Sequence, residues 1–131
     1  MVTDVIGDFI NRLTTATAVR KTSVTVPYSK LKLQIALVLK REGYLGEITE
    51  SKDTVGKTLT VELMYEPDGE PRIHGVKRLS KPGRRLYSGV HAIHPVKNGK
   101  GCLLLTTPRG IMTDKDAHRD RVGGETMFNI W

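Results

Sequence analysis

Hydrophobic residues recur every three or four positions near the start of the chain, which is the spacing of one face of an amphipathic helix. The series consists of Val2, Val5, Ile6, Phe9, Ile10, Leu13 and Ala16, and it predicts a helix over about residues 3–18. A weak alternation over 23–26 then predicts a short strand that ends at Pro27. Ser29 is suited to cap a second helix, and Gly43 is suited to end it.

The second helix is predicted to be amphipathic as well. Its buried side should carry the apolar residues Leu31, Ile35, Val38 and Leu39, and its other side the cations Lys30, Lys32, Lys40 and Arg41. Strands are predicted at 44–49, 58–64 and 72–79, with a turn at Pro67-Asp68-Gly69. Residues 1–79 therefore predict an N-terminal α/β lobe with two helices on a small sheet.

Residues 80–131 predict a mainly β C-terminal lobe with one short helix. A basic turn leads into a short strand, and the apolar run Cys102–Leu105 predicts another strand. A rigid loop is expected after it, followed by a helix over 113–121 and a last strand over 125–131. The predicted fold class is α+β.

The net charge of +7 is concentrated in the second half of the chain. Residues 1–70 carry 9 Lys and Arg against 10 Asp and Glu, whereas residues 71–131 carry 12 against 4. The 43 residues between Glu70 and Asp114 contain 9 Lys and Arg and no acid. Because protein surfaces normally mix both signs of charge, this segment indicates a polyanionic partner, with a merely solubilising surface as the alternative.

Candidate catalytic chemistry is sparse. The sequence contains no Walker loop and no GxGxxG, GxSxG or HExxH pattern. The enzymatic alternative is a zinc site on His91, His94 and Asp114, but two histidines three residues apart, followed by proline, are a poor start for a tetrahedral site. We therefore expect no catalytic residue, no metal site and no cofactor.

The single cysteine, Cys102, cannot form an internal disulfide, which favours a reducing compartment. The sequence has no run of 18 apolar residues and no signal-peptide pattern at its start. We expect a cytoplasmic protein with no membrane partner.

Nucleic-acid binding explains the residues better than catalysis. Lys81, Arg84 and Arg85 surround Pro82-Gly83, a stiff turn that can hold three cations toward phosphates. The ring of Tyr87 suits stacking on a ribose or base, although a half-buried core position is the alternative.

The short hydroxyl side chains of Thr106 and Thr107 suit an irregular RNA surface better than a DNA major groove. The late helix has mixed charges and only a weak basic face, which argues against a DNA recognition helix. The residues alone thus indicate a protein that binds structured RNA mainly through its C-terminal half.

Five segments occur in a family-like order and spacing. They are PYSKLK (27–32), RLSKPGRRLY (78–87), GKG (99–101), TTPRGIMTD (106–114) and VGGE with the final Trp131. Together they resemble small-subunit ribosomal protein eight of the bacterial and organellar type, over essentially the whole chain. The resemblance implies a non-enzymatic protein that binds the central domain of small-subunit rRNA, acts early in subunit assembly and represses its own operon through a similar messenger structure.

The resemblance also implies site residues. The loop matching 106–110 enters the RNA minor groove, the tyrosine matching Tyr87 contacts RNA nearby, and Gly124 and Glu125 belong to a Gly-Gly-Glu turn that orders this surface. A second RNA segment is expected at the start of the second helix. The expected RNA-binding residues are Lys30, Lys32, Lys81, Arg84, Arg85, Tyr87, Thr106, Thr107, Arg109, Gly110, Gly124 and Glu125.

Two positions depart from the family pattern. Family members usually carry Ser-Thr-Ser where this chain has Thr106-Thr107-Pro108, so a hydroxyl and a backbone N–H are missing at the third position. Thr14-Thr15 replaces a common Arg-Asn pair, which predicts the loss of a phosphate contact from the first lobe.

The expected partners are the rRNA central domain, neighbouring small-subunit proteins and the messenger of the protein's own operon. The expected location is the ribosome, in the cytoplasm or, for an organelle-encoded chain, in the matrix or stroma. The alternative function is a free-standing RNA-binding translational repressor that uses the same surface.

Overall fold

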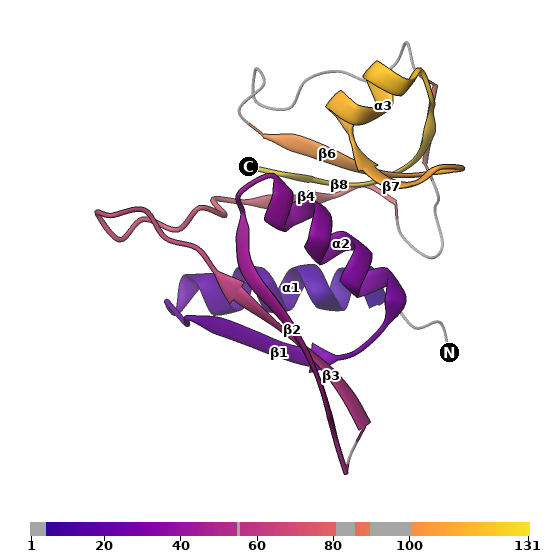
Figure 1. The fold of residues 1–131 in the computed structure, drawn as a ribbon. Helices are drawn as coiled ribbons and strands as arrows, with labels where there is room; N and C mark the ends of the chain where they lie inside the picture. The colour runs from indigo at the N-terminus through magenta and orange to yellow at the C-terminus, as the bar shows by residue number, and fades with distance from the viewer. Residues whose placement is uncertain (1–4, 55, 81–85, 90–100) are drawn as a thin grey trace. The chain divides into compact units, whose positions relative to one another are not determined.

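The protein was analysed as a computed structural model, which describes residues 5–54, 56–80, 86–89 and 101–131 (Figure 1). Residues Val5–Ile73 form one compact unit, and His74–Trp131 belong to a second. Both units combine helix with antiparallel sheet, which confirms the predicted α+β class.

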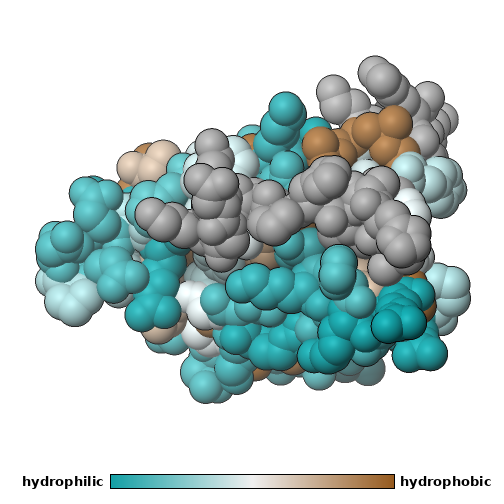
Figure 2. Space-filling view, turned by 90° about the horizontal axis from the view of Figure 1, so that it is seen from above, coloured by the Kyte–Doolittle hydropathy of each residue, from teal (hydrophilic) through white to brown (hydrophobic). Residues whose placement is uncertain are grey.

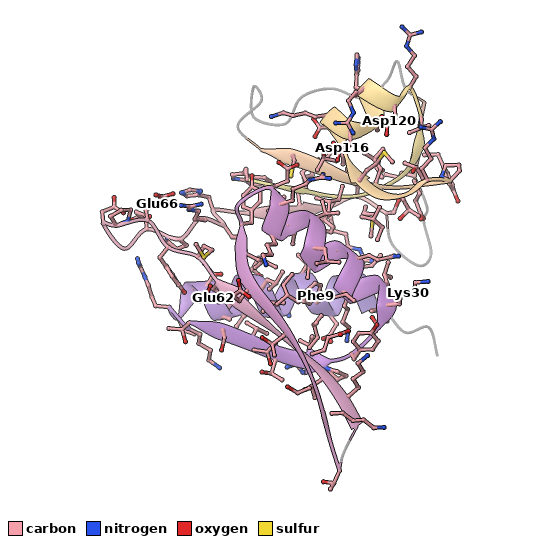
Figure 3. The ribbon with its side chains drawn as sticks, viewed as in Figure 1. Phe9, Lys30, Glu62, Glu66, Asp116 and Asp120 are labelled. Atoms are coloured by element: carbon pink, nitrogen blue, oxygen red, sulfur yellow. The ribbon has the colours of Figure 1, made fainter. Side chains whose placement is uncertain are left out.

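The N-terminal unit contains two helices and a three-stranded sheet. Its elements are α1 (Val5–Ala18), β1 (Ser23–Pro27), α2 (Lys30–Arg41), β2 (Leu45–Asp53) and β3 (Gly56–Leu63). The sheet has the order β1-β3-β2 with both pairs antiparallel. Leu59, Val61 and Leu63 alternate as buried residues along β3, so one face of the sheet carries the core, as the alternating pattern predicts. Phe9 of α1, labelled in Figure 3, is completely buried.

Local signals define both ends of α2. The hydroxyl of Ser29 accepts a hydrogen bond from the backbone N–H of Lys32 at 3.1 Å, as an N-cap does. At the other end Gly43 has a φ of 89°, and the N–H groups of Gly43 and Tyr44 donate to the carbonyls of Lys40 and Leu39. This pattern is a Schellman motif, so both predicted helix ends are confirmed.

The C-terminal unit is a sheet that is covered on one face by a short helix. Its elements are β4 (Val76–Arg78), β5 (Tyr87–Ser88), β6 (Cys102–Thr107), β7 (Gly110–Thr113), α3 (Asp114–Asp120) and β8 (Gly124–Ile130). The sheet has the order β4-β8-β6-β7, and β5 also pairs with β8. Thr113 and Asp116 form a capping box at the start of α3.

A buried apolar cluster joins α3 to the sheet. Ala117 of α3 packs with Leu103, Leu105 and Met112 of β6 and β7. The buried carboxylate of Asp114 accepts a hydrogen bond from the backbone N–H of Leu103 at 3.2 Å, which ties the first turn of α3 to β6.

Two predicted elements differ from the structure. The strand expected over 72–79 in the first lobe is only the three-residue β4, and it pairs with β8 of the C-terminal sheet. Local alternation carries no information about the partner strand, which explains this error. The loop expected after Leu105 is a β-hairpin, because β6 continues to Thr107 and pairs with β7, a strand that the sequence pattern did not reveal.

We expect Ser29→Ala to lower the free energy of unfolding by about 1 kcal/mol, because it removes the N-cap of α2. Chemical denaturation measures this change. Ser23→Ala, on an exposed strand residue, is the matched control and should change the stability by less than about 0.5 kcal/mol. Equal effects of the two substitutions would contradict the capping role of Ser29.

Candidate nucleic-acid interface

Four strands place one residue each in a row across the C-terminal sheet. Tyr87 of β5 is paired with Glu125 of β8, Glu125 with Thr106 of β6, and Thr106 with Ile111 of β7. Directly paired residues of antiparallel strands point to the same face of a sheet. Tyr87, Glu125, Thr106 and Ile111, which we call the cross-strand row, therefore lie side by side on one face.

The cross-strand row faces away from α3. The next residues along the strands, Thr126, Leu105 and Met112, are paired with one another and buried. Leu105 and Met112 pack against Ala117 of α3. Since successive residues of a strand point to opposite faces, the cross-strand row lies on the face that α3 does not cover.

The members of the cross-strand row differ in exposure. The side chain of Tyr87 is 73% exposed, Thr106 is exposed, and Glu125 and Ile111 are half-buried. This exposure rules out the half-buried core position for Tyr87. The row thus offers an aromatic ring, a carboxylate, a hydroxyl and an aliphatic side chain to a partner.

The hairpin between β6 and β7 extends this surface. The connection consists of Pro108 and Arg109, both exposed, and Gly110 follows with a φ of 113°. Proline presets the φ of the first turn position, and glycine tolerates the positive φ at the end of the turn. Arg109 therefore lies at the tip of a narrow turn with its guanidinium exposed.

Thr107 is buried and holds the turn from inside. Its hydroxyl donates to the carbonyl of Gly110 at 2.9 Å and accepts from the backbone N–H of Arg109 at 3.1 Å. The Thr107 hydroxyl is thus used in two hydrogen bonds within the hairpin, and its RNA contact stays a prediction. Thr106, its neighbour, presents the exposed hydroxyl.

Gly124 allows β8 to lie close to β6. A Cβ atom at this position would overlap the backbone carbonyl oxygen of Thr106 and press on the methyl of Thr107. Steric crowding therefore explains why position 124, the second glycine of the Gly-Gly-Glu segment, carries no side chain. The close approach that Gly124 allows sets the distance between Glu125 and Thr106 in the cross-strand row.

The expected basic turn falls outside the described residues, since Lys81, Arg84 and Arg85 lie in the segment 81–85. The two residues that flank it are joined directly. The hydroxyl of buried Ser80 accepts from the N–H of Leu86 at 2.9 Å and is 3.2 Å from its carbonyl. Thr126 of β8 also donates to that carbonyl, from its N–H at 2.9 Å. The sequence analysis did not predict this role of Ser80. The signal that could have indicated it is a hydroxyl residue directly before the basic turn.

The two lysines expected to touch a second RNA segment differ. Lys30 is exposed at the start of α2 (Figure 3). Lys32 is only 7% exposed, and its Nζ donates to the carbonyl of Pro27 at 2.9 Å. The expectation that Lys32 lies on the exposed side of α2 is wrong, because its long side chain bends back to the preceding strand.

The described residues give little support to a metal site, a reactive cysteine or a membrane span. Among them, no group of three His, Cys, Asp or Glu side chains could hold a metal ion. His91 and His94 lie outside the described part of the chain, and Cys102 is buried. None of the described helices is long and apolar enough to cross a membrane.

The described surface is mainly polar. Its large exposed apolar side chains are Val19, Leu37, Leu86 and Tyr87. The face shown in Figure 2 is predominantly hydrophilic where it is coloured. A polar partner fits this surface better than a hydrophobic one.

Comparison with known proteins gives one family. The family model described as ribosomal protein S8 matches residues 4–131. The small ribosomal subunit protein uS8 of Chloroflexus aggregans is 44% identical over 131 residues, which cover 99% of this chain and 98% of the relative. The protein of the same name from Opitutus terrae is 45% identical over 130 residues, 98% of this chain and 99% of the relative.

We expect Gly124→Ala to lower the free energy of unfolding by about 1–3 kcal/mol or more, because a backbone oxygen cannot move aside as a side chain can. Thermal denaturation of the full chain measures this. Gly89→Ala is the matched control, since a Cβ at Gly89 meets nothing within 4 Å. A Gly124→Ala variant as stable as the control would show that β8 and β6 lie farther apart than described.

Proposed function

This chain belongs to the ribosomal protein S8 family, and from that membership we propose that it is a structural, non-enzymatic component of the small ribosomal subunit. We further propose that it binds the central domain of small-subunit rRNA directly and supports subunit assembly. The cross-strand row is the observation that carries the binding proposal, because it gathers residues from four strands on the face that α3 does not cover, with Tyr87 and Thr106 exposed.

The shape of this surface suits the minor groove of an irregular RNA helix. The groove of A-form RNA that proteins can enter is wide and shallow and displays ribose hydroxyls and base edges. The narrow turn at Pro108 and Arg109 projects from the sheet next to Thr106 and carries one exposed guanidinium. Such a turn can reach base edges while its cation contacts a phosphate.

Tyr87 supplies the stacking part of the proposed contact. Its ring is largely exposed at the outer end of the cross-strand row, next to Glu125. Aromatic side chains stack on unpaired bases or pack on riboses in many RNA complexes. An irregular helix with splayed bases would therefore bind better than a regular duplex.

Phosphate neutralisation is assigned to cations around this surface. Lys81, Arg84 and Arg85 lie between Ser80 and Leu86, which are hydrogen-bonded to each other and tied to β8. This attachment brings both ends of the basic segment to the strand that carries Glu125. Lys30, on the N-terminal unit, is assigned to a separate RNA segment.

The same surface would serve a messenger RNA that mimics the rRNA site, so repression of the protein's own operon is the second proposed activity. Neighbouring small-subunit proteins are the remaining proposed partners. Co-sedimentation with the small subunit separates a ribosomal component from a free-standing repressor, because the latter stays in the supernatant.

We expect the full chain to prefer a central-domain rRNA fragment over a plain duplex of equal length, and to keep this preference as salt rises. Salt weakens phosphate contacts in both complexes alike, whereas shape readout adds affinity only for the fragment. Filter binding across a salt series measures both affinities.

Tyr87→Ala should weaken fragment binding by about 1–3 kcal/mol, the cost of one lost stack, and leave duplex binding nearly unchanged. Tyr87→Phe keeps the ring and is the matched control. Equal affinity of the wild type for the fragment and the duplex, collapsing together with salt, would contradict the proposed function.

Thr107→Val should weaken fragment binding by about 1 kcal/mol, because it removes the two hydrogen bonds that hold the turn around Arg109. Thr107→Ser retains the hydroxyl and should bind like the wild type. Filter binding with both RNAs is the measurement. Similar losses for the fragment and the duplex would show that the turn has no part in shape readout.

A further inference from the structure

Helix α3 and its cap carry three acids and three Lys or Arg residues, but the structure places them on different sides. The acids are turned inward: Asp114 is buried on the N–H of Leu103, and the side chains of Asp116 and Asp120 are only 13% and 28% exposed. Nη2 of Arg119 lies 3.4 Å from Oδ1 of Asp116 and its Nε lies 3.2 Å from Oδ1 of Asp120, so the two acids, labelled in Figure 3, share one cationic partner.

The remaining basic residues lie outward. Lys115, His118 and Arg121 are all exposed, and their side chains have no partner within the described part of the chain. Lys115 and His118 are three residues apart and share one side of α3, and Arg121 follows at the C-cap. We call these three residues the α3 stripe. The mixed sequence of α3 thus gives a basic surface once it is folded.

Arg121 ends α3 in the left-handed backbone conformation, and the N–H of the next residue, Val122, donates to the carbonyl of Ala117 as in a Schellman motif. Its φ is 55°, in the left-handed region that favours glycine at the end of a helix. The other described left-handed residue outside glycine is Arg20, whose guanidinium donates to the carbonyl of Gly69. The guanidinium of Arg121 is exposed and makes no such hydrogen bond to a described residue. The backbone of Arg121 thus serves the helix end, and its exposed side chain is left for a partner.

We propose that the α3 stripe binds the phosphate backbone of a second RNA segment. The inference rests on the proposed function and extends it to the other side of the C-terminal sheet. Because α3 covers the face opposite the cross-strand row, the two surfaces of this unit point in different directions. They therefore engage different RNA segments, and the stripe adds affinity without reading bases.

The chemistry of the α3 stripe fits phosphate. Lys115 and Arg121 provide an ammonium and a guanidinium, and His118 adds an imidazole N–H donor. Among described residues these groups are exposed without carboxylate partners, so a phosphate oxygen would meet donors alone.

The test uses Arg121→Gly in the full chain and two transcripts, the whole rRNA central domain and its irregular helix alone. We expect the melting temperature to rise by about 3 °C, since glycine removes the left-handed arginine. Affinity for the whole domain should fall about threefold or more, and the salt slope should drop by about 0.7–0.9. Affinity for the irregular helix alone should not change.

Two further variants test whether the α3 stripe binds RNA. Lys115→Gln should weaken binding to the whole domain without a gain in stability. Arg20→Gly is the matched control, because it removes the other left-handed arginine; it should bind both transcripts like the wild type.

A stabilised Arg121→Gly variant that binds the whole domain like the wild type would overturn the proposal and leave Arg121 as a helix cap alone. Equal losses on both transcripts would overturn the separate second segment. Failure of the proposed function is distinct: Tyr87→Ala would then bind both transcripts like the wild type, while the effect of Arg121→Gly on the whole domain would still decide the α3 stripe.

Discussion

The C-terminal unit depends on β8, which is paired along both edges. Its first residues pair with β5 and its last with β4 on one edge, and β6 pairs along the other. Segments that are far apart in the sequence are therefore aligned by one strand. Gly124 sets how closely that strand lies to β6, and Glu125 lies between Tyr87 and Thr106 in the cross-strand row. Without β8, no strand would hold Tyr87 and Thr106 next to each other in the sheet.

Elements with strong local signals were predictable from the sequence. The amphipathic period of α1, the Ser29 cap and the Gly43 end of α2 each depend on residues that are near one another in the chain. The partner of β4 and the existence of β7 depend on pairing across long sequence distances, so local alternation could not supply them. The same limit applies to the cross-strand row. Its residues could be suspected singly, but their adjacency is a matter of register.

Side-chain direction was the second limit of the sequence. Lys32 has the sequence position of an exposed cation, but its Nζ returns to Pro27. Thr107 has the position of a contact residue, but its hydroxyl is used within the hairpin. In α3 the alternating charges suggested a weak basic face, whereas the folded helix turns acids inward and cations outward. In each case the hydrogen-bond or ion-pair partner in the folded chain, and not the residue type, decided whether the side chain is exposed.

The position of β8 as the last described strand has a consequence for synthesis. Translation is vectorial, so a nascent chain interrupted before Gly124 contains Tyr87, Thr106 and most of the positive charge but no strand that aligns them. If the chain binds RNA as proposed, such a product would attract RNA through charge alone and could not discriminate one helix from another. Under the proposed function, shape recognition would require a chain whose synthesis has passed this strand, and truncated products would not compete for the specific site.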